Sequence, residues 1–482
     1  MNKQEAAIKY ITENYLQFNR LRYDVIADKL QIRVADSFGE RAPSEAKSFA
    51  GDPAEAKGDK ASRQEQWREM TKHDINSIVC HAAQEYDTNI TTREVITALH
   101  SDLIPHVHPL REYVLSLRPY TPEQPDWIDF VASQVTVKAS PESATDRCEA
   151  PVDRHFVAGD GLFSTASTTS APQQRDPQCS ASETIYSEQR ERSKADALWR
   201  SCFKKWFVAM VASWMKEEVV NHQVLVLIGK QGIYKTTWLE HLIPPHLRAY
   251  ACKLANSNEL NKDERLRIAE FGLISLDEID SMNNRELNQL KSIITSSDVN
   301  ERAAYAYSKE RRIRLASFCA SGNRREFLTD LTGNRRWLPF EVESIQNPFY
   351  TTLPYEQMYA EAWALAQDPM FSYWFELDEI EVLEQHNQLF RDESNEEQLL
   401  PILFDVPAEG RGEFMTTAQI SERLVSYGNI KKPMALSRLG MVLGAAGYQS
   451  TRPKIGGRLI RGWLVYQRDT DEIASLKRLL KE

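Results

Sequence analysis

The amino-acid sequence predicts an α/β fold built around a mostly parallel sheet between about residues 194 and 376. Three apolar runs, "QVLVLIG", "FGLISLDEID" and "LASFCASGN", read as strands and are separated by helical segments. This alternation is the order in which parallel sheets are built. Each run ends in glycine or polar residues, so we expect the functional groups to gather at the carboxyl edge of the sheet.

The composition describes an ordinary globular protein. The chain has 482 residues, 42% of them hydrophobic and 27% charged, which is enough for several domains. A net charge of −10 excludes a protein that coats nucleic acid by overall positive charge, so DNA contacts must come from local basic patches. The six cysteines form no C-x-x-C pair, which argues against a zinc site or a disulfide framework.

Targeting signals are not evident in the sequence. Its longest strongly apolar run, residues 206–215, is far shorter than a membrane span, and the N-terminus "MNKQEAAIKY" lacks a signal-peptide core. We therefore expect a cytoplasmic protein without a membrane partner.

The pattern along the chain predicts four parts. Residues 1–137 predict an α-helical N-terminal region, with a flexible insertion rich in Ala, Gly, Pro and Ser near 41–62. Residues 138–193 are of low complexity and typical of a solvated linker. Residues 194–376 carry the α/β pattern. Residues 377–482 predict a helical connector, two helices and a basic hairpin with a Gly-Gly turn, an order that resembles a winged-helix domain.

A strongly amphipathic helix is expected at the start of the α/β part, over residues 194–220. An aromatic stripe at helical spacing is more typical of core packing than of a binding platform, so we expect it to be buried. The stripe consists of Trp199, Phe203, Trp206, Met210 and Trp214.

The stretch "GKQGIYKTTW", residues 229–238, resembles a phosphate-binding loop in which Tyr234 replaces the second glycine. In such a loop backbone N–H groups surround the phosphates, the Lys neutralises them and the hydroxyl of the next residue binds Mg²⁺. The alternative is a plain Gly-containing turn between strand and helix. The expected nucleotide-binding residues are Gly229, Gln231, Gly232, Ile233, Tyr234, Lys235, Thr236 and Thr237, with Thr236 also a magnesium ligand.

Two carboxylates follow the second apolar run, about 40 residues after Lys235. In a Walker B arrangement the first, Asp277, would hold hydrated Mg²⁺ and the second, Glu278, would act as general base on the attacking water. The alternative for this pair alone is an acidic helix cap. Asn323 ends the third run, where its side chain would orient water near the γ-phosphate.

The order of loop, acidic pair and polar strand end matches the AAA+ type of P-loop NTPase, whose sheet carries an additional strand. The segment "DLTGNRRWLPF" then places Arg335 and Arg336 in a polar turn before an apolar strand. We expect them to serve as an arginine finger supplied by a neighbouring subunit. The alternative is a pair of surface arginines.

These motifs together resemble the virulence-associated protein E family, which belongs with the phage and plasmid primase-helicase ATPases related to superfamily 3 helicases. The resemblance is specific over about residues 195–345 and extends more weakly to both sides. Members from Bacteroides-type mobile elements are most similar, and the family tolerates a non-glycine residue before the loop lysine. The resemblance implies ATP and Mg²⁺ as cofactors, a homo-oligomeric ring and a DNA-contacting hairpin before the third strand.

The segment "AAYAYSKERRIRLASF" supports that hairpin independently, because two strand-like runs flank a basic tip. Lys309, Arg311 and Arg312 are the residues that we expect to contact single-stranded DNA in the ring channel. The alternative is a solvated basic hairpin. The predicted hairpin of the C-terminal unit carries four basic residues that would contact the backbone of duplex DNA: Arg452, Lys454, Arg458 and Arg461. The alternative is that these residues only increase solubility.

The sequence therefore predicts a Mg²⁺-dependent ATPase, a ring-forming DNA helicase or translocase in replication of a mobile element or phage. No N-terminal segment resembles a primase module, so a primase would be a separate protein. The first alternative is a non-translocating regulatory ATPase that binds DNA or a partner protein through its winged helix. The second is a degenerate nucleotide-binding protein, against which the intact Asp277–Glu278 pair counts.

Overall fold

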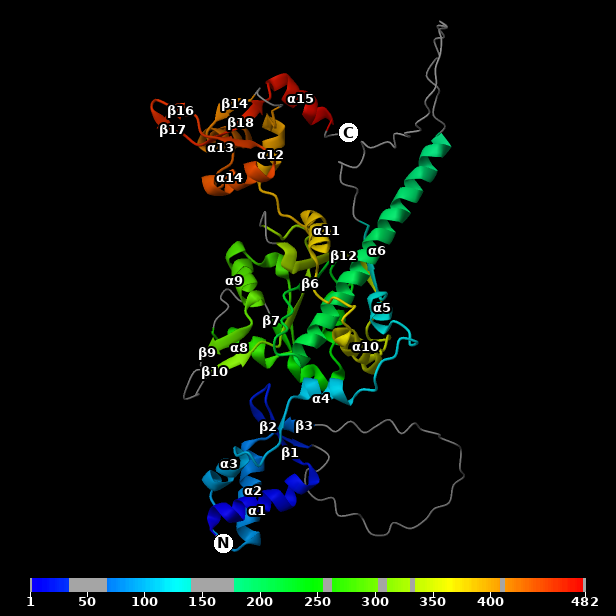
Figure 1. The fold of residues 1–482 in the computed structure, drawn as a ribbon, viewed down its shortest axis with the longest axis vertical. Helices are drawn as coiled ribbons and strands as arrows, with labels where there is room; N and C mark the ends of the chain where they lie inside the picture. The colour runs from blue at the N-terminus through cyan, green and yellow to red at the C-terminus, as the bar shows by residue number, and fades with distance from the viewer. Residues whose placement is uncertain are drawn as a thin grey trace.

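The computed structural model describes residues 2–33, 67–139, 177–254, 262–301, 310–329, 334–407 and 412–479 (Figure 1). The insertion expected near 41–62 lies outside these residues, as do the linker residues 140–176 and the hairpin residue Lys309. In the described part of the chain no helix has the length and apolar character needed to cross a membrane.

A six-stranded sheet forms the centre of the molecule, and the expected α/β fold with a parallel sheet is confirmed. The strand order is β5-β12-β6-β11-β8-β7, in which β5 runs antiparallel to β12 and the other neighbours are parallel. In chain order the strands are β5 (Val135–Val137), β6 (Val224–Ile228), β7 (Ala251–Leu254), β8 (Leu273–Leu276), β11 (Ser317–Gly322) and β12 (Trp337–Ile345).

Both faces of the sheet are buried, as expected for parallel strands covered by helices. Along β6, Leu225 and Leu227 face one core, whereas Val224, Val226 and Ile228 face the other. The first core lies against α6 (Pro177–Met215), α7 (Lys235–His241) and α10 (Tyr355–Gln367). The second lies against α8 (Lys262–Glu270) and α9 (Asn284–Thr295).

The aromatic stripe of α6 belongs to the first core, so the prediction of core packing is confirmed. The indole N–H of Trp199, Trp206 and Trp214 donates to the carbonyls of Ala132, Phe318 and Gly272, at 3.0, 3.1 and 3.2 Å. These bonds satisfy the polar atoms of otherwise apolar side chains. The helix begins already at Pro177, inside the segment expected to be a linker, because low sequence complexity there hides the helical pattern.

The N-terminal region is not helical throughout, and that expectation is wrong for its strands. A four-stranded sheet of order β3-β2-β1-β4 packs with α1 (Lys3–Asn14), α2 (Lys72–Glu85) and α3 (Thr92–Leu99). A turn with Asp28 at φ 58° joins β1 (Leu21–Asp24) to β2 (Lys29–Arg33), and strands this short leave too few residues to show their period in the sequence. The remaining strands are β3 (Trp67–Glu69) and β4 (His106–Val107).

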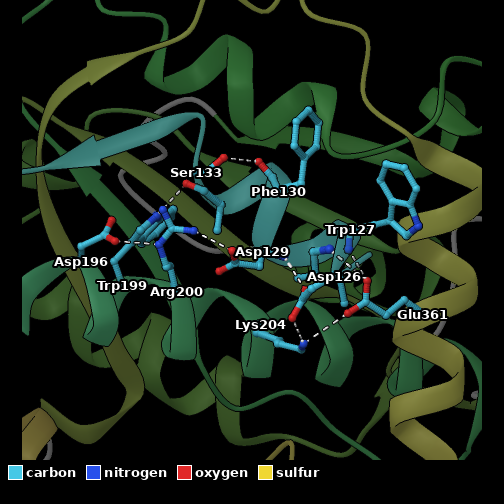
Figure 2. A network of polar contacts seen from close by, with 12 residues as sticks. Asp126, Trp127, Asp129, Phe130, Ser133, Asp196, Trp199, Arg200, Lys204 and Glu361 are labelled. Carbon is cyan, nitrogen blue, oxygen red and sulfur yellow. Dashed lines mark hydrogen bonds and ion pairs between the residues drawn. The ribbon is translucent and has the colours of Figure 1, made fainter. Parts of the chain in front are cut away.

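The segment α4 (Pro109–Ser116), α5 (Trp127–Ala132) and β5 packs within the central unit rather than with the preceding helices. Figure 2 shows a polar network that holds α5 in place. The Glu361 carboxylate on α10 accepts hydrogen bonds from the backbone N–H groups of Trp127 and Ile128 at 2.6 and 3.1 Å. Lys204 of α6 lies between Glu361 and Asp126, at 3.2 and 2.5 Å.

The C-terminal region has its own hydrophobic core, formed around Leu424, Leu443 and Trp463. Strand β18 pairs antiparallel with both β14 and β15, and the hairpin β16–β17 turns through Gly456 and Gly457 at φ 59° and 84°. The two expected helices and the Gly-Gly hairpin are confirmed. The elements are α11 (Leu377–Gln388), α12 (Asn395–Leu403), β13 (Phe404–Asp405), β14 (Glu413–Met415), α13 (Thr417–Gly428), α14 (Leu436–Ala445), β15 (Gln449–Thr451), β16 (Lys454–Ile455), β17 (Arg458–Leu459), β18 (Gly462–Gln467) and α15 (Thr470–Leu479).

Candidate functional site

The loop between β6 and α7 is the predicted phosphate-binding loop, and its backbone turns through positive φ angles. Gly229 has φ 156°, and a Cβ there would lie 2.7 Å from the carbonyl oxygen of Val342. Gly232 has φ 87°. Tyr234 adopts the left-handed conformation, with φ 67° and ψ 18°, immediately before the helix begins. The tyrosine thus takes a backbone conformation that glycine takes at no steric cost, at roughly 1 kcal/mol of strain.

Lys235 is held inside this loop and is only 6% exposed. Its ammonium group donates to the carbonyls of Gly229 and Lys230, both at 2.7 Å, and to the Oδ1 of Asn323 at 3.3 Å. Burial lowers the pKa of Lys235, while Asp280 and Asp277 act in the opposite direction. The side chain is therefore oriented toward the strand ends.

The hydroxyl of Thr236 lies at the acidic strand end. Thr236 Oγ1 donates to Asp277 Oδ1 at 3.2 Å and lies 2.9 Å from Ser321 Oγ, which donates to the same carboxylate oxygen at 2.7 Å. Burial raises the pKa of Asp277, but hydrogen bonds from Lys253 and Ser321 outweigh it and hold the pKa below its usual value. The carboxylate is thus favoured in its charged form.

Oxygen donors of this kind fit a hard cation such as Mg²⁺. Within the described residues no cluster of three or more His, Cys, Asp or Glu side chains could hold a metal ion. Mg²⁺ in nucleotide sites keeps several waters and is bound by one or two protein groups plus substrate phosphates. Thr236 and Asp277 are the residues that would hold it.

Glu278 follows Asp277 in the left-handed conformation, with φ 52°. Its carbonyl accepts bonds from the backbone N–H and the hydroxyl of Ser281, at 2.9 and 2.8 Å, so the turn is fixed. The Asp280 carboxylate accepts bonds from the N–H groups of Asn323 and Arg324, at 3.2 and 3.1 Å. Asp280 therefore positions the end of β11 beside the acidic turn.

A cavity of about 320 Å³ lies at this edge of the sheet. Because β11 pairs with both β6 and β8, the loop, the acidic pair and Asn323 come from adjacent strand ends. The lining residues are Gln231, Gly232, Tyr234, Lys235, Thr236, Thr237, Asp277, Glu278, Ser321, Gly322 and Asn323.

Sequence reasoning missed three polar residues of this site. Ser321 is a polar residue two positions before Asn323 in an apolar strand, which could have marked it as facing the same edge. Asp280 belongs to the same "DEID" run as the two predicted carboxylates. Lys253 comes from the separate strand β7, and its position carries no signal in the sequence.

Arg335 and Arg336 lie at the opposite edge of the sheet. They form the turn η6 (Asn334–Arg336), and the next residue, Trp337, pairs with Val224 at the start of β6. The phosphate loop follows the other end of β6, roughly 13 Å away at ~3.3 Å per residue. Neither arginine lines the loop cavity of the described structure.

A second cavity, of about 370 Å³, contains both arginines together with Tyr373, Trp374 and Phe375. The side-chain amide of Asn387 on α11 donates to the carbonyls flanking the arginine turn, at 2.8 and 3.1 Å. Burial and the neighbouring Arg335 lower the pKa of Arg336. The turn is thus held by hydrogen bonds from α11 and carries two neighbouring positive charges.

The expected hairpin is present as the antiparallel strands β9 (Asp298–Glu301) and β10 (Glu310–Ile313). Its tip, with Lys309, lies outside the described residues. Arg311 is exposed, and its Nε donates to Asp298 at 2.9 Å. Arg312 is largely buried between Asp28 of the N-terminal sheet, at 2.9 Å, and Glu270, at 3.6 Å.

Residues 182–392 match the model of the virulence-associated protein E-like domain. No curated protein matches the chain. The apo structure of the NrS-1 C-terminal region is similar at 11% identity and a TM-score of 0.39, covering 96% of this chain and 100% of that one. An A-form apo structure of the same region has a TM-score of 0.37, also at 11% identity, covering 96% of this chain and 100% of that one.

Proposed function

We propose that the chain, whose residues 182–392 match the model of the virulence-associated protein E-like domain, is a Mg²⁺-dependent ATPase that assembles as a ring and moves along DNA. Replication of a mobile element or phage is the process in which we expect it to act. The observation that carries this proposal is that the loop after β6, the acidic pair after β8 and the polar end of β11 lie together at one edge of the sheet. Lys235 lies 3.3 Å from Asn323, and Thr236 lies 3.2 Å from Asp277.

Each residue then has a distinct task in hydrolysis. The loop N–H groups and Lys235 bind the phosphates, and Thr236 and Asp277 hold the magnesium ion, which neutralises phosphate charge when bound. Glu278 accepts a proton from the attacking water, and Asn323 orients that water. The position of β11 between β6 and β8 supports an AAA+-like core, because there the additional strand separates loop strand and acidic strand.

A ring would bring the arginine turn of one subunit to the nucleotide of the next. The distance of Arg335 and Arg336 from the loop of their own chain supports action in trans rather than in cis. An arginine finger supplied in this way stabilises charge that develops during phosphoryl transfer.

Two surfaces would contact DNA. The β9–β10 hairpin would contact single-stranded DNA in the ring channel. Arg311 is an exposed cation of this hairpin within the described residues, and Lys309 would lie at its tip. The order α12, β14, α13, α14, β15, hairpin, β18 supports a winged-helix-like unit. Its hairpin carries the exposed Arg452, Lys454, Arg458 and Arg461, which suit contact with a duplex backbone. We propose that any primase acts as a separate protein.

One observation favours the alternative of a regulatory ATPase that does not translocate. Arg312 is neutralised by carboxylates of its own chain, including Asp28, and Arg311 is paired with Asp298. The deciding experiment measures ATP hydrolysis with and without single-stranded DNA, together with displacement of a labelled strand from a duplex. We expect single-stranded DNA to stimulate ATP hydrolysis and the protein to displace the labelled strand. DNA binding without either effect would support the regulatory alternative.

A further inference from the structure

Two exposed aromatic side chains follow the end of β12, and the first of them, Phe349, lies beside the predicted phosphate loop. Phe349 is 69% exposed and the neighbouring Tyr350 is 89% exposed. Single exposed apolar side chains are common, but adjacent aromatic rings next to a polar cavity are typical of ligand binding. The tasks proposed above use neither residue.

The backbone fixes these rings in place. The side chain of Asn347 accepts a hydrogen bond from the N–H of Phe349 at 3.0 Å, and its carbonyl accepts one from the N–H of Tyr350 at 3.1 Å. Pro348, which lies between Asn347 and Phe349 in the sequence, is buried. A turn closed in this way holds its side chains outward at little entropic cost, because its backbone is already ordered.

The turn contacts the phosphate loop directly. The ring of Phe349 meets the ring of Tyr234 edge to face, with centroids 6.4 Å apart, and meets His241 of α7 at 5.7 Å. The amide of Asn347 lies 3.4 Å from the hydroxyl of Tyr234. Tyr234 lines the loop cavity and immediately precedes Lys235. The aromatic surface is therefore continuous with the cavity.

The direction of a bound nucleotide follows from the loop chemistry. Lys235, Asp277 and Asn323 define the end that takes the β- and γ-phosphates. Thr237 lines the cavity one residue beyond the magnesium ligand Thr236, and its carbonyl lies 2.7 Å from His241 Nδ1. A nucleotide whose outer phosphates face Asp277 thus extends its sugar and base past Thr237 toward His241 and Phe349.

We propose that Phe349 and Tyr234 form the nucleobase subsite and take the purine ring of the nucleotide. This inference rests on the proposed function, since it concerns the nucleotide whose phosphates bind the loop. Stacking on an aromatic face suits a base because every base presents a π surface, and the larger purine ring gains more contact than a pyrimidine. Tyr234 thus supplies a ring where the general loop pattern has a glycine.

The test separates the base from the phosphates. Titration calorimetry of the full chain with Mg²⁺ measures the affinity for ADP and for inorganic tripolyphosphate, which has no base. Phe349→Ala is expected to weaken ADP binding by about tenfold or more, the effect of losing one stacked base. Its affinity for tripolyphosphate should be unchanged, and Phe349→Trp should restore ADP binding. Phe18→Ala, which removes an exposed phenylalanine of the N-terminal region, is the matched control.

Other outcomes are equally informative. Unchanged ADP binding by Phe349→Ala would overturn the subsite, and so would an equal loss for both ligands, because the ring would then act only by supporting the loop. A change in self-association with intact ADP binding would overturn it as well, since the turn would then be a contact between copies of this chain. Failure of the unmodified chain to bind either ligand would overturn the proposed ATPase itself.

Discussion

The ammonium group of Lys253 lies 2.7 Å from Oδ2 of Asp277, the carboxylate that we propose as a magnesium ligand. Lys253 is the penultimate residue of β7, and Asp277 directly follows the neighbouring parallel strand β8, in which Leu276 is in register with Leu254 of β7. The hydrogen bond to Asp277 raises the pKa of Lys253, so the lysine remains charged. A cation of the protein would thus compete with the proposed Mg²⁺ for one of the two carboxylate oxygens.

Removing that competitor should strengthen metal binding. Lys253→Met is expected to lower the Mg²⁺ concentration for half-maximal binding several-fold, since a partly exposed ion pair contributes at most about 1 kcal/mol. Titration with Mn²⁺ in the presence of ADP, followed by electron paramagnetic resonance, measures this without hydrolysis. Lys29→Met removes a comparable exposed lysine paired with Glu69 and should have no effect. Equal affinity in both variants would count against competition at Asp277.

The left-handed backbone at Tyr234 makes a prediction about stability. Tyr234→Gly and Tyr234→Ala both remove the ring, but only glycine relieves the strain, so the glycine variant should be more stable by about 1 kcal/mol. Thermal unfolding compares the two. The same pair of substitutions at Glu384, an exposed position in α11, should show the opposite order because glycine is unfavourable inside a helix. If the glycine and alanine variants ranked in the same order of stability at both positions, the backbone strain assigned to Tyr234 would be contradicted.

The sequence predicted the centre of this molecule better than its periphery, for a physical reason. A loop lysine directly after a glycine-containing turn, and carboxylates directly after an apolar run, are local patterns, so Lys235 and Asp277 could be proposed from the sequence. Lys253 reaches the same carboxylate from another strand, and its contact depends on how strands are ordered in space. The short strands β1 and β2 have too few residues to show a period, and their sheet is specified by contacts with distant segments.

A pH dependence of stability follows from the network in Figure 2. Glu361 is 1% exposed, and burial with the nearby Asp126 raises its pKa to about 7. The native state therefore holds a proton that the unfolded state releases, so stability falls as pH rises from about 4.5 to about 7, by at most ~1.4 kcal/mol per pH unit. For Asp126, burial favours a higher pKa, but hydrogen bonds from Lys204 and the backbone of Asp129 outweigh it, so its own effect lies at lower pH.

Glu361→Gln should remove this dependence, because an amide does not titrate and its oxygen can still accept from Trp127 and Ile128. Denaturant unfolding at several pH values between 5 and 8 measures it, with Glu343→Gln, an exposed carboxylate paired with Arg192, as control. A slope that persists in the Glu361 variant would assign the proton to another group.

The two central motifs should separate binding from hydrolysis. Lys235→Ala is expected to abolish ATP binding, because it removes the cation held inside the phosphate loop. Glu278→Gln should leave binding intact but stop turnover, since an amide cannot accept a proton from water. Calorimetric ATP binding and a phosphate-release assay give the two readouts. Normal ATP binding by the Lys235 variant would refute the assignment of the loop.

The arginine turn provides the clearest test of the ring. Arg335 and Arg336 stand at the amino edge of the sheet, while the loop stands at the carboxyl edge, so neither side chain is placed to reach the nucleotide of its own chain. Arg335→Ala or Arg336→Ala should therefore leave ATP binding largely intact and reduce turnover by about 10³-fold or more. Arg192→Ala removes an exposed arginine elsewhere and should have no such effect.

Mixing subunits decides whether the arginines act across an interface. An Arg335→Ala subunit keeps an intact loop, and a Lys235→Ala subunit keeps intact arginines, so a mixed ring contains interfaces at which both intact elements meet. Partial recovery of ATP hydrolysis is expected in the mixture, although each variant alone is inactive. Recovery should depend on the mixing ratio, because it requires the two kinds of subunit to be neighbours. A mixture that demonstrably co-assembles and yet remains inactive would show that the arginines do not act in trans.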